Sequence, residues 1–161
     1  MKTKVNNEIT AIYRGVSGAP LYRPTFLVRV QGGFPSPADD HIEERIDFSK
    51  EFIKHPEATF YLRCIGDSME PLVSFNSLLM VDRMERADDT DVIIALVNSD
   101  MCVKQLSFGA DGNIYLISEN PRYRPIKIQE TDDFQVWGVV TNIIHPLRGR
   151  ARVRLVKATV Q

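Results

Sequence analysis

Short apolar runs separated by turn-forming residues fill most of the chain between residues 58 and 144, and this pattern constrains the fold more than any other feature. The runs are rich in Val, Ile, Leu and aromatic residues, and turns recur at about every tenth position, which is typical of antiparallel β proteins. Asn98–Asp100 and Gly109–Gly112 carry residues that favour hairpin turns. We therefore predict a mainly β fold, a partly open antiparallel barrel or sandwich. The predicted strands span residues 58–64, 77–82, 91–97, 101–107, 113–118 and 134–144.

A glycine–proline boundary separates this region from the start of the chain. Residues 9–14 and 25–31 are predicted to be extended, and the run Gly32-Gly33-Phe34-Pro35-Ser36-Pro37 follows them. A Gly-Gly pair resists regular structure, and each proline restricts the residue before it to extended conformations. The predicted organisation is an N-terminal arm over residues 1–32, a β-rich core over residues 33–145 and a basic tail over residues 146–161.

One short helix is predicted just after this boundary. Residues Asp39–Ile53 begin with two aspartates that can cap a helix, and Pro56 follows the segment. Ile42, Ile46 and Ile53 fall near one face at helical spacing. The fold class is therefore β with a single N-terminal helix.

Composition excludes several classes of protein. A chain of 161 residues with 43% apolar residues can bury a core without disulfides or metal. The two cysteines, Cys64 and Cys102, form no metal-binding pattern and lie in predicted strands, so we expect buried free thiols. No apolar stretch reaches the ~20 residues of a membrane helix, and residues 1–10 are polar, without the apolar segment typical of a secretory leader. We expect a cytoplasmic protein without cofactor or metal.

The net charge of −1 conceals an uneven distribution. Residues 1–32 have a net charge of +4, with one acid among them, and residues 146–161 have a net charge of +5. The segment between them has a net charge of −10. The basic ends are either solvated termini or, in the case of the tail, a weak contact for nucleic acid or a partner.

The turn Gly66-Asp67-Ser68-Met69 is the first candidate for chemistry. It follows a predicted strand and leads into a polar loop. Gly66 permits a sharp backbone path that would expose the Ser68 hydroxyl and direct neighbouring N–H groups, including those of Asp67 and Met69, at one point, as an oxyanion hole requires. Serine in a turn is also commonplace, so this motif alone does not identify a nucleophile.

A nucleophilic serine needs a base, and Lys104 is a better candidate than any histidine. His41, His55 and His145 lie in contexts typical of surface or hydrogen-bonded histidines. Lys104 lies in the middle of an apolar predicted hairpin. Burial penalises an ammonium, and a neutral amine can accept a serine proton. The alternative is a strand lysine whose stem reaches water.

Several motifs between about residues 25 and 145 occur in the order and spacing of a known family. They are Gly33–Ala38, Glu44–Asp47, His55-Pro56, Gly66–Met69, Leu78–Asp82, Val103–Leu106, Asn120–Ile126 and Val136–Val140. In these motifs the chain resembles the UmuD branch of the LexA/UmuD serine–lysine peptidases.

This resemblance implies a fold, a reaction and partners. It implies that Ser68 is the nucleophile, that Lys104 is the general base, and that the chain cuts itself between Gly32 and Gly33. It also implies stimulation of the cut by a RecA–single-stranded-DNA filament in the SOS response to DNA damage. The shortened product, residues 33–161, would dimerise and join a UmuC-type error-prone translesion polymerase.

The chain also departs from the family pattern. Gly32 stands where relatives usually have Cys or Ala, and the turns at Phe75–Ser77 and Thr90–Ile93 differ from theirs. These differences affect turns more than chemistry. The basic tail has no role in the family pattern.

Three other functions fit parts of the sequence. A LexA-like repressor needs a helix-turn-helix domain, and residues 1–32 contain no three-helix pattern. A signal peptidase shares the serine–lysine chemistry but needs a membrane anchor. A non-catalytic module that clamps a polymerase would have no need of both Ser68 and Lys104.

Overall fold

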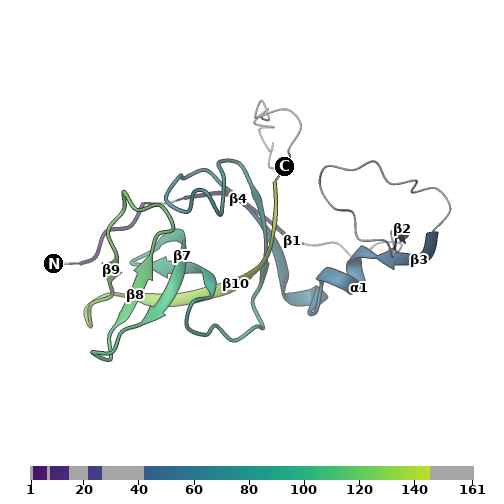
Figure 1. Cartoon of the computed structure of the whole chain (residues 1–161). Coiled ribbons are helices and arrows are strands. Elements are labelled where there is room, and N and C mark those ends of the chain that lie inside the picture. The colour runs from purple at the N-terminus through teal and green to yellow at the C-terminus, as the bar shows by residue number, and fades with distance from the viewer. Residues whose placement is uncertain (1, 7, 15–21, 27–41, 146–161) are drawn as a thin grey trace, which may run out of the picture.

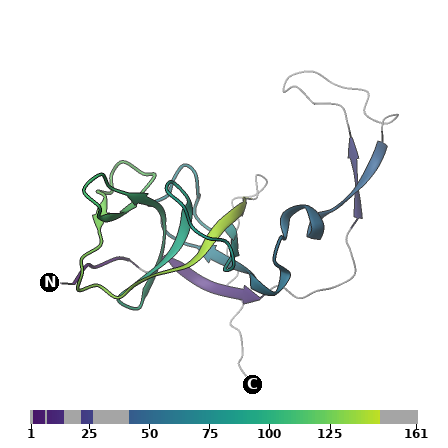
Figure 2. The same ribbon diagram turned by 90° about the horizontal axis from the view of Figure 1, so that it is seen from below.

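The computed structural model describes residues 2–6, 8–14, 22–26 and 42–145. Most of them form one antiparallel eight-stranded sheet with the order β1-β4-β5-β10-β6-β7-β8-β9 (Figures 1 and 2). The sheet is not closed, since β1 and β9 stand at its two ends. The predicted mainly β, partly open architecture is therefore confirmed. The strands are β1 Ile9–Arg14, β4 Thr59–Cys64, β5 Leu78–Asp82, β6 Val92–Val97, β7 Asp100–Phe108, β8 Ile114–Ile117, β9 Ile126–Lys127 and β10 Phe134–Ile144.

The β6–β7 hairpin shows how the local sequence sets the register. Its two-residue turn places Asn98 at φ 50° and Ser99 at φ 76°. Two successive left-handed residues match the twist of the flanking strands in a tight hairpin. The resulting register pairs Ile93 with Lys104 and Ala95 with Cys102. The turn therefore determines where Lys104 lies along the sheet.

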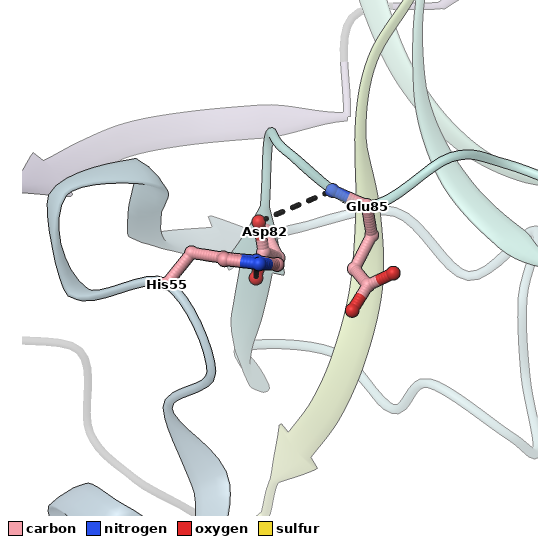
Figure 3. Close-up of side chains that lie close together, drawn as sticks. All are labelled: His55, Asp82 and Glu85. Atoms are coloured by element: carbon pink, nitrogen blue, oxygen red, sulfur yellow. Dashed lines mark hydrogen bonds and ion pairs between the residues drawn. The ribbon is translucent and has the colours of Figure 1, made fainter.

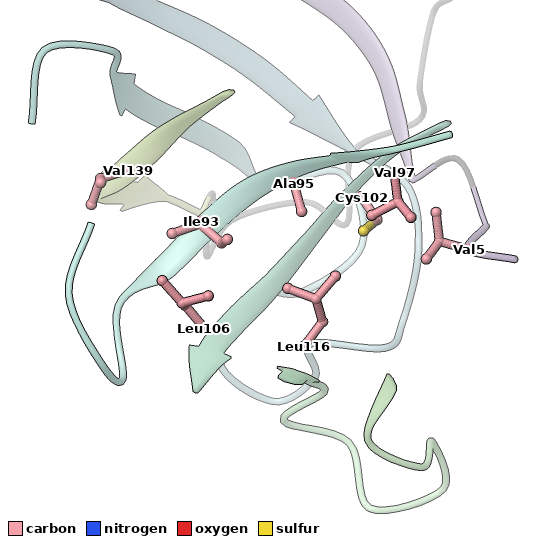
Figure 4. Packing of buried hydrophobic residues seen from close by; sticks show 8 residues of the cluster. All are labelled: Val5, Ile93, Ala95, Val97, Cys102, Leu106, Leu116 and Val139. Carbon is pink, nitrogen blue, oxygen red and sulfur yellow. The ribbon is translucent and has the colours of Figure 1, made fainter. Parts of the chain in front are cut away.

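Side chains alternate along β6 and β7 between two buried clusters. Ile93, Ala95 and Val97 enter one cluster, shown in Figure 4, with Cys102 and Leu106 of β7. Their neighbours Ile94 and Val103 enter the other cluster. Both faces of these strands are buried, as expected for apolar runs rather than strict alternation. Val5, from the segment before β1, packs into the first cluster with 5% of its surface exposed.

The region before residue 58 corrects part of the sequence prediction. Residues Ile42–Asp47 form strand β3, which pairs with β2, Tyr22–Phe26, in a separate two-stranded sheet beside the main one (Figure 1). Helix α1 covers Phe48–Phe52 alone and is capped by Asp47, whose carboxylate accepts the Ser49 N–H. The predicted helix over Asp39–Ile53 was therefore wrong over residues 42–47, and residues 39–41 lie outside the described residues. A spacing of four residues, as between Ile42 and Ile46, fits one face of a helix and one face of a strand equally well.

Strand β10 lies in the middle of the sheet. It pairs with β5 on one side and β6 on the other. Apolar residues on both faces of such a strand are accounted for by packing within one chain. The strand is thus no free edge on which a second copy could pair.

Candidate active site

Ser68 lies in the turn that follows β4, as its sequence context indicates. Its side chain is buried, with 2% of the residue exposed. The turn is closed by a hydrogen bond from the Glu70 N–H to the Asp67 carbonyl, 3.1 Å. Met69 is buried at the start of the following segment. The hydroxyl is therefore held inside the protein rather than free in a surface loop.

Lys104 reaches Ser68 from β7. The Lys104 Nζ lies 2.6 Å from the Ser68 Oγ and 2.9 Å from the Val103 carbonyl oxygen. Lys104 has 4% of its surface exposed, so its stem does not carry the amine to water. The structure thus brings together two residues that are 36 positions apart in the sequence.

Glu8 is the third member of this group, and the sequence does not single it out. Its Oε2 accepts a hydrogen bond from Lys104 Nζ at 2.7 Å, and the two side chains are 8% and 5% exposed. A Cβ added at Gly66 would lie 2.8 Å from the Glu8 Oε1, so glycine is needed there for this close approach. Residues 1–32 carry a net positive charge, and Glu8 is the one acidic residue in this segment. That exception is the sequence signal that could have drawn attention to it.

The loop after β8 holds the serine turn from another side. Asn120 donates through its Nδ2 to the Asp67 carbonyl at 3.0 Å and through its backbone N–H to the Ser68 carbonyl at 2.9 Å. The Tyr123 hydroxyl donates to the Asp67 carboxylate at 2.5 Å. This hydrogen bond raises the pKa of Tyr123 above its ordinary value. Asn120 and Tyr123 therefore position the turn, a role that the sequence motif Asn120–Ile126 did not specify.

The two cysteines are free and buried, which confirms the sequence expectation. Burial raises the pKa of the Cys64 thiol, and it raises the pKa of Cys102 to about 11. Cys102 is fully buried two residues before Lys104. A protonated buried thiol is a poor nucleophile, so neither cysteine competes with Ser68 for chemistry.

A second polar cluster, shown in Figure 3, lies at the end of β5. The Asp82 carboxylate accepts from the His55 Nδ1 at 2.7 Å and from the backbone N–H groups of Met84 and Glu85 at 2.8 and 3.3 Å. The Glu85 carboxylate pairs with Lys54. These hydrogen bonds hold the turn that follows β5 in place. His55 is thus engaged away from Ser68.

The remaining predicted residues fall elsewhere. His145 lies 3.3 Å from the Ser77 Oγ. His41, the expected scissile pair Gly32 and Gly33, and the basic tail over 146–161 lie outside the described residues. No helix in the part of the chain that the structure describes has the length and apolarity to cross a membrane.

Comparison with known proteins identifies the family, and the family model covers Ser68 and Lys104 but not Glu8. The family model described as peptidase S24-like matches residues 22–141. The chain is 37% identical over 127 residues to protein ImpA of Escherichia coli, which covers 78% of this chain and 86% of ImpA. It is 38% identical over 126 residues to protein SamA of Salmonella typhimurium, with the same coverage. It is 33% identical over 119 residues to the LexA repressor of Ectopseudomonas mendocina, covering 72% of this chain and 57% of that repressor.

Proposed function

The chain belongs to the S24-like peptidase family, and we propose that it is a serine peptidase that cuts its own chain between Gly32 and Gly33. The observation that carries this proposal is the 2.6 Å contact between the Ser68 Oγ and the Lys104 Nζ, with both side chains buried. Such a pair has what acyl transfer requires, a nucleophile and an amine that can take its proton.

The reaction proceeds through an ester between Ser68 and Gly32. The neutral Lys104 amine accepts the Ser68 proton while the Oγ attacks the Gly32 carbonyl carbon. The C–N bond to Gly33 then breaks, and the new amine of Gly33 takes the proton from Lys104. Water hydrolyses the ester with Lys104 again accepting a proton, which frees Ser68 and leaves a carboxylate on Gly32.

The turn around Ser68 supports the charge that develops during the attack. We expect the backbone N–H groups between Gly66 and Met69 to be the donors, since such groups stabilise an oxyanion when they are held in place. The hydrogen bonds from Asn120 to Asp67 and Ser68 supply that rigidity. Gly32 and Gly33 have no side chains to resist an extended path through the site.

The shortened chain, residues 33–161, acts as an accessory subunit of an error-prone translesion polymerase in the cytoplasmic SOS response. Its similarity to ImpA and SamA supports this placement. We propose that a RecA–single-stranded-DNA filament stimulates the cut and that the product is a homodimer that joins a UmuC-type subunit. Light scattering that finds a monomer at micromolar concentration after cutting would contradict the homodimer.

A non-catalytic clamp for a polymerase, or a LexA-like regulator without a DNA-binding domain, is the competing function. The similarity to a LexA repressor favours the second of these alternatives, a regulator. In a non-catalytic clamp Ser68 and Lys104 would have no reason to lie in hydrogen-bond contact inside the protein.

Intact-mass measurement during incubation tests the proposal. Wild-type chain, with and without the filament, should lose residues 1–32, and Ser68→Ala should stay at full length. Gly32→Ala should still be cut, whereas the bulky Gly33→Trp should not, because an indole side chain resists the extended path that the scissile bond must take to Ser68. A Gly33→Trp chain cut at this bond as fast as wild type would refute the position of the cut.

A further inference from the structure

The segment before β1 enters the active site and fills the hydrogen-bonding positions around Lys104. We call residues 3–6 and 8 the N-terminal strap. A lysine ammonium has three N–H donors, and Lys104 Nζ has three acceptors: Glu8 Oε2, Ser68 Oγ and the Val103 carbonyl, at 2.7, 2.6 and 2.9 Å. In this arrangement the amine donates to the serine, whereas a base must accept from it. The hydrogen bond between Glu8 and Lys104 therefore belongs to the resting state of the site, in which Lys104 is not yet ready to accept the Ser68 proton.

The strap also occupies an open strand edge beside the dyad. Strand β8 pairs with β7 from Gln105 onward and leaves Met101–Lys104 without that neighbour. Glu8 lies along this stretch, where its N–H donates to the Met101 carbonyl at 3.0 Å. Its own carbonyl accepts from the Ile65 N–H at 3.0 Å, just before the serine turn. An extended substrate that approaches Ser68 would add to the same edge by the same kind of backbone pairing.

The far end of the strap is fastened to the body. The Thr3 N–H donates to the Asp132 carboxylate at 2.8 Å, and the Asn98 side chain donates to the Thr3 carbonyl at 3.0 Å. The Asn98 side chain also donates to the Asp132 carboxylate at 2.9 Å, and the hydrogen bonds from Thr3 and Asn98 hold the pKa of Asp132 below its usual range. Val5 is buried in the cluster of Figure 4. The strap is thus anchored at two points, one apolar and one polar, with Glu8 beyond them in the active site.

We propose that the N-terminal strap holds the active site shut, and that Glu8 must leave Lys104 before the chain can cut itself. Glu8 acts as a positioning residue in two ways. Its carboxylate stabilises the charged amine, which has no lone pair for the Ser68 proton. Its backbone occupies the β7 edge that the scissile segment needs. The inference rests on the proposed self-cleavage and adds its regulation, by a residue that lies outside the family match.

The test compares the rate of self-cleavage of Glu8→Gln with that of wild type across about pH 7 to 10. Glutamine keeps the size of the side chain and removes its charge. The substitution therefore removes the ion pair with the Lys104 amine, 2.7 Å in wild type. We expect Glu8→Gln to cut roughly ten-fold faster near neutrality, with a rate profile displaced to lower pH. Glu8→Asp, which keeps the charge but shortens the side chain, should lie between.

Two further variants keep the test independent of a folding defect. Val5→Asp weakens the strap without altering the dyad and should also raise the rate. Glu57→Gln is the matched control, because it removes an exposed ion pair between Arg14 of the arm and the body, a kind that contributes little. It should cut like wild type. Circular dichroism confirms the fold of each variant.

The outcomes separate this inference from the proposed function. Glu8→Gln and Val5→Asp that cut no faster than wild type at any pH, with an unchanged profile, would overturn the strap as an inhibitor. A Ser68→Ala, Glu8→Gln double variant that still shortens at Gly32–Gly33 would instead overturn the serine–lysine mechanism. Faster cutting that disappears in the double variant supports both.

Discussion

At the residue scale, the position of the Ser68 hydroxyl depends on partners that take no part in the reaction. The turn that carries it is held by Asn120 through backbone and side chain and by Tyr123 through the Asp67 carboxylate. Small displacements of a reacting atom slow the reaction, because nucleophilic attack needs a narrow range of distances and angles. The loop after β8 is therefore part of the working site although it is distant in sequence.

This role predicts a selective effect of one hydroxyl. Tyr123→Phe should slow self-cleavage by roughly two- to ten-fold, the range that one hydrogen bond contributes. Tyr115→Phe is its control, because Tyr115 also donates to an exposed aspartate, Asp111, at 2.8 Å, but away from the site. The measurement is the first-order loss of full-length chain. Equal rates for the two variants would show that Tyr123 does not position the turn.

Cys102 provides a prediction that follows from burial alone. Its folded pKa of about 11 exceeds the ordinary value of 9.0, because burial disfavours the thiolate. Between those values the unfolded chain loses the proton and the folded chain keeps it, so stability falls as pH rises through this window. Urea unfolding at about pH 8 and about pH 10 should show a larger decrease in wild type than in Cys102→Ala. An identical decrease in both would contradict a buried, protonated thiol.

At the element scale, the β6–β7 turn fixes the register that places Lys104. Ser99 adopts φ 76°, a conformation that a residue with a Cβ reaches at a cost. Ser99→Gly should therefore stabilise the protein by about 0.5–1 kcal/mol, measured by urea unfolding. Ser107→Gly, within β7, should destabilise it, because glycine weakens a strand interior. A destabilised Ser99→Gly variant would show that the serine side chain makes a contact that outweighs the backbone strain.

The elements that the sequence predicts well are those with a single consistent pattern. The strands from β4 to β8 and β10 follow from apolar runs bounded by turn residues. Lys104 was singled out within one of these runs, and Ser68 in the turn after another. Strand β3 could not be distinguished from a helix, because Ile42 and Ile46 fit both periods. Strand β9 has two residues, Ile126 and Lys127, too few to form a pattern. Glu8 was missed because its partner is 96 positions away.

At the scale of the whole molecule, the arm is part of the main sheet. Strand β1 forms the sheet edge through five registered pairs with β4, and Val5 contributes to the core. Cutting at Gly32–Gly33 would make these contacts intermolecular, and the contacts would lose the high effective concentration that a continuous chain provides. The cut product would then expose β4 as a new edge, to which another strand can add.

Hydrogen exchange on the protein before and after cutting checks this consequence. Amides of β4 that face β1 should exchange faster once the arm has been released at low protein concentration. Amides of β6, which is paired with β10 on one side and β7 on the other, should keep their protection. Unchanged protection of β4 would mean that the arm stays bound after the cut.

The measurement that tests the central claim most directly is the rate of loss of full-length chain as a function of pH, for wild type and Lys104→Ala. A lysine base works as the neutral amine, so the wild-type rate should climb through the mildly alkaline range and then level off. Lys104→Ala, folded by circular dichroism, should not shorten at all. A histidine base would instead give a rise near pH 6.5. A rate that is already flat from about pH 7 upward, or a Lys104→Ala chain cut at Gly32–Gly33, would contradict the serine–lysine mechanism.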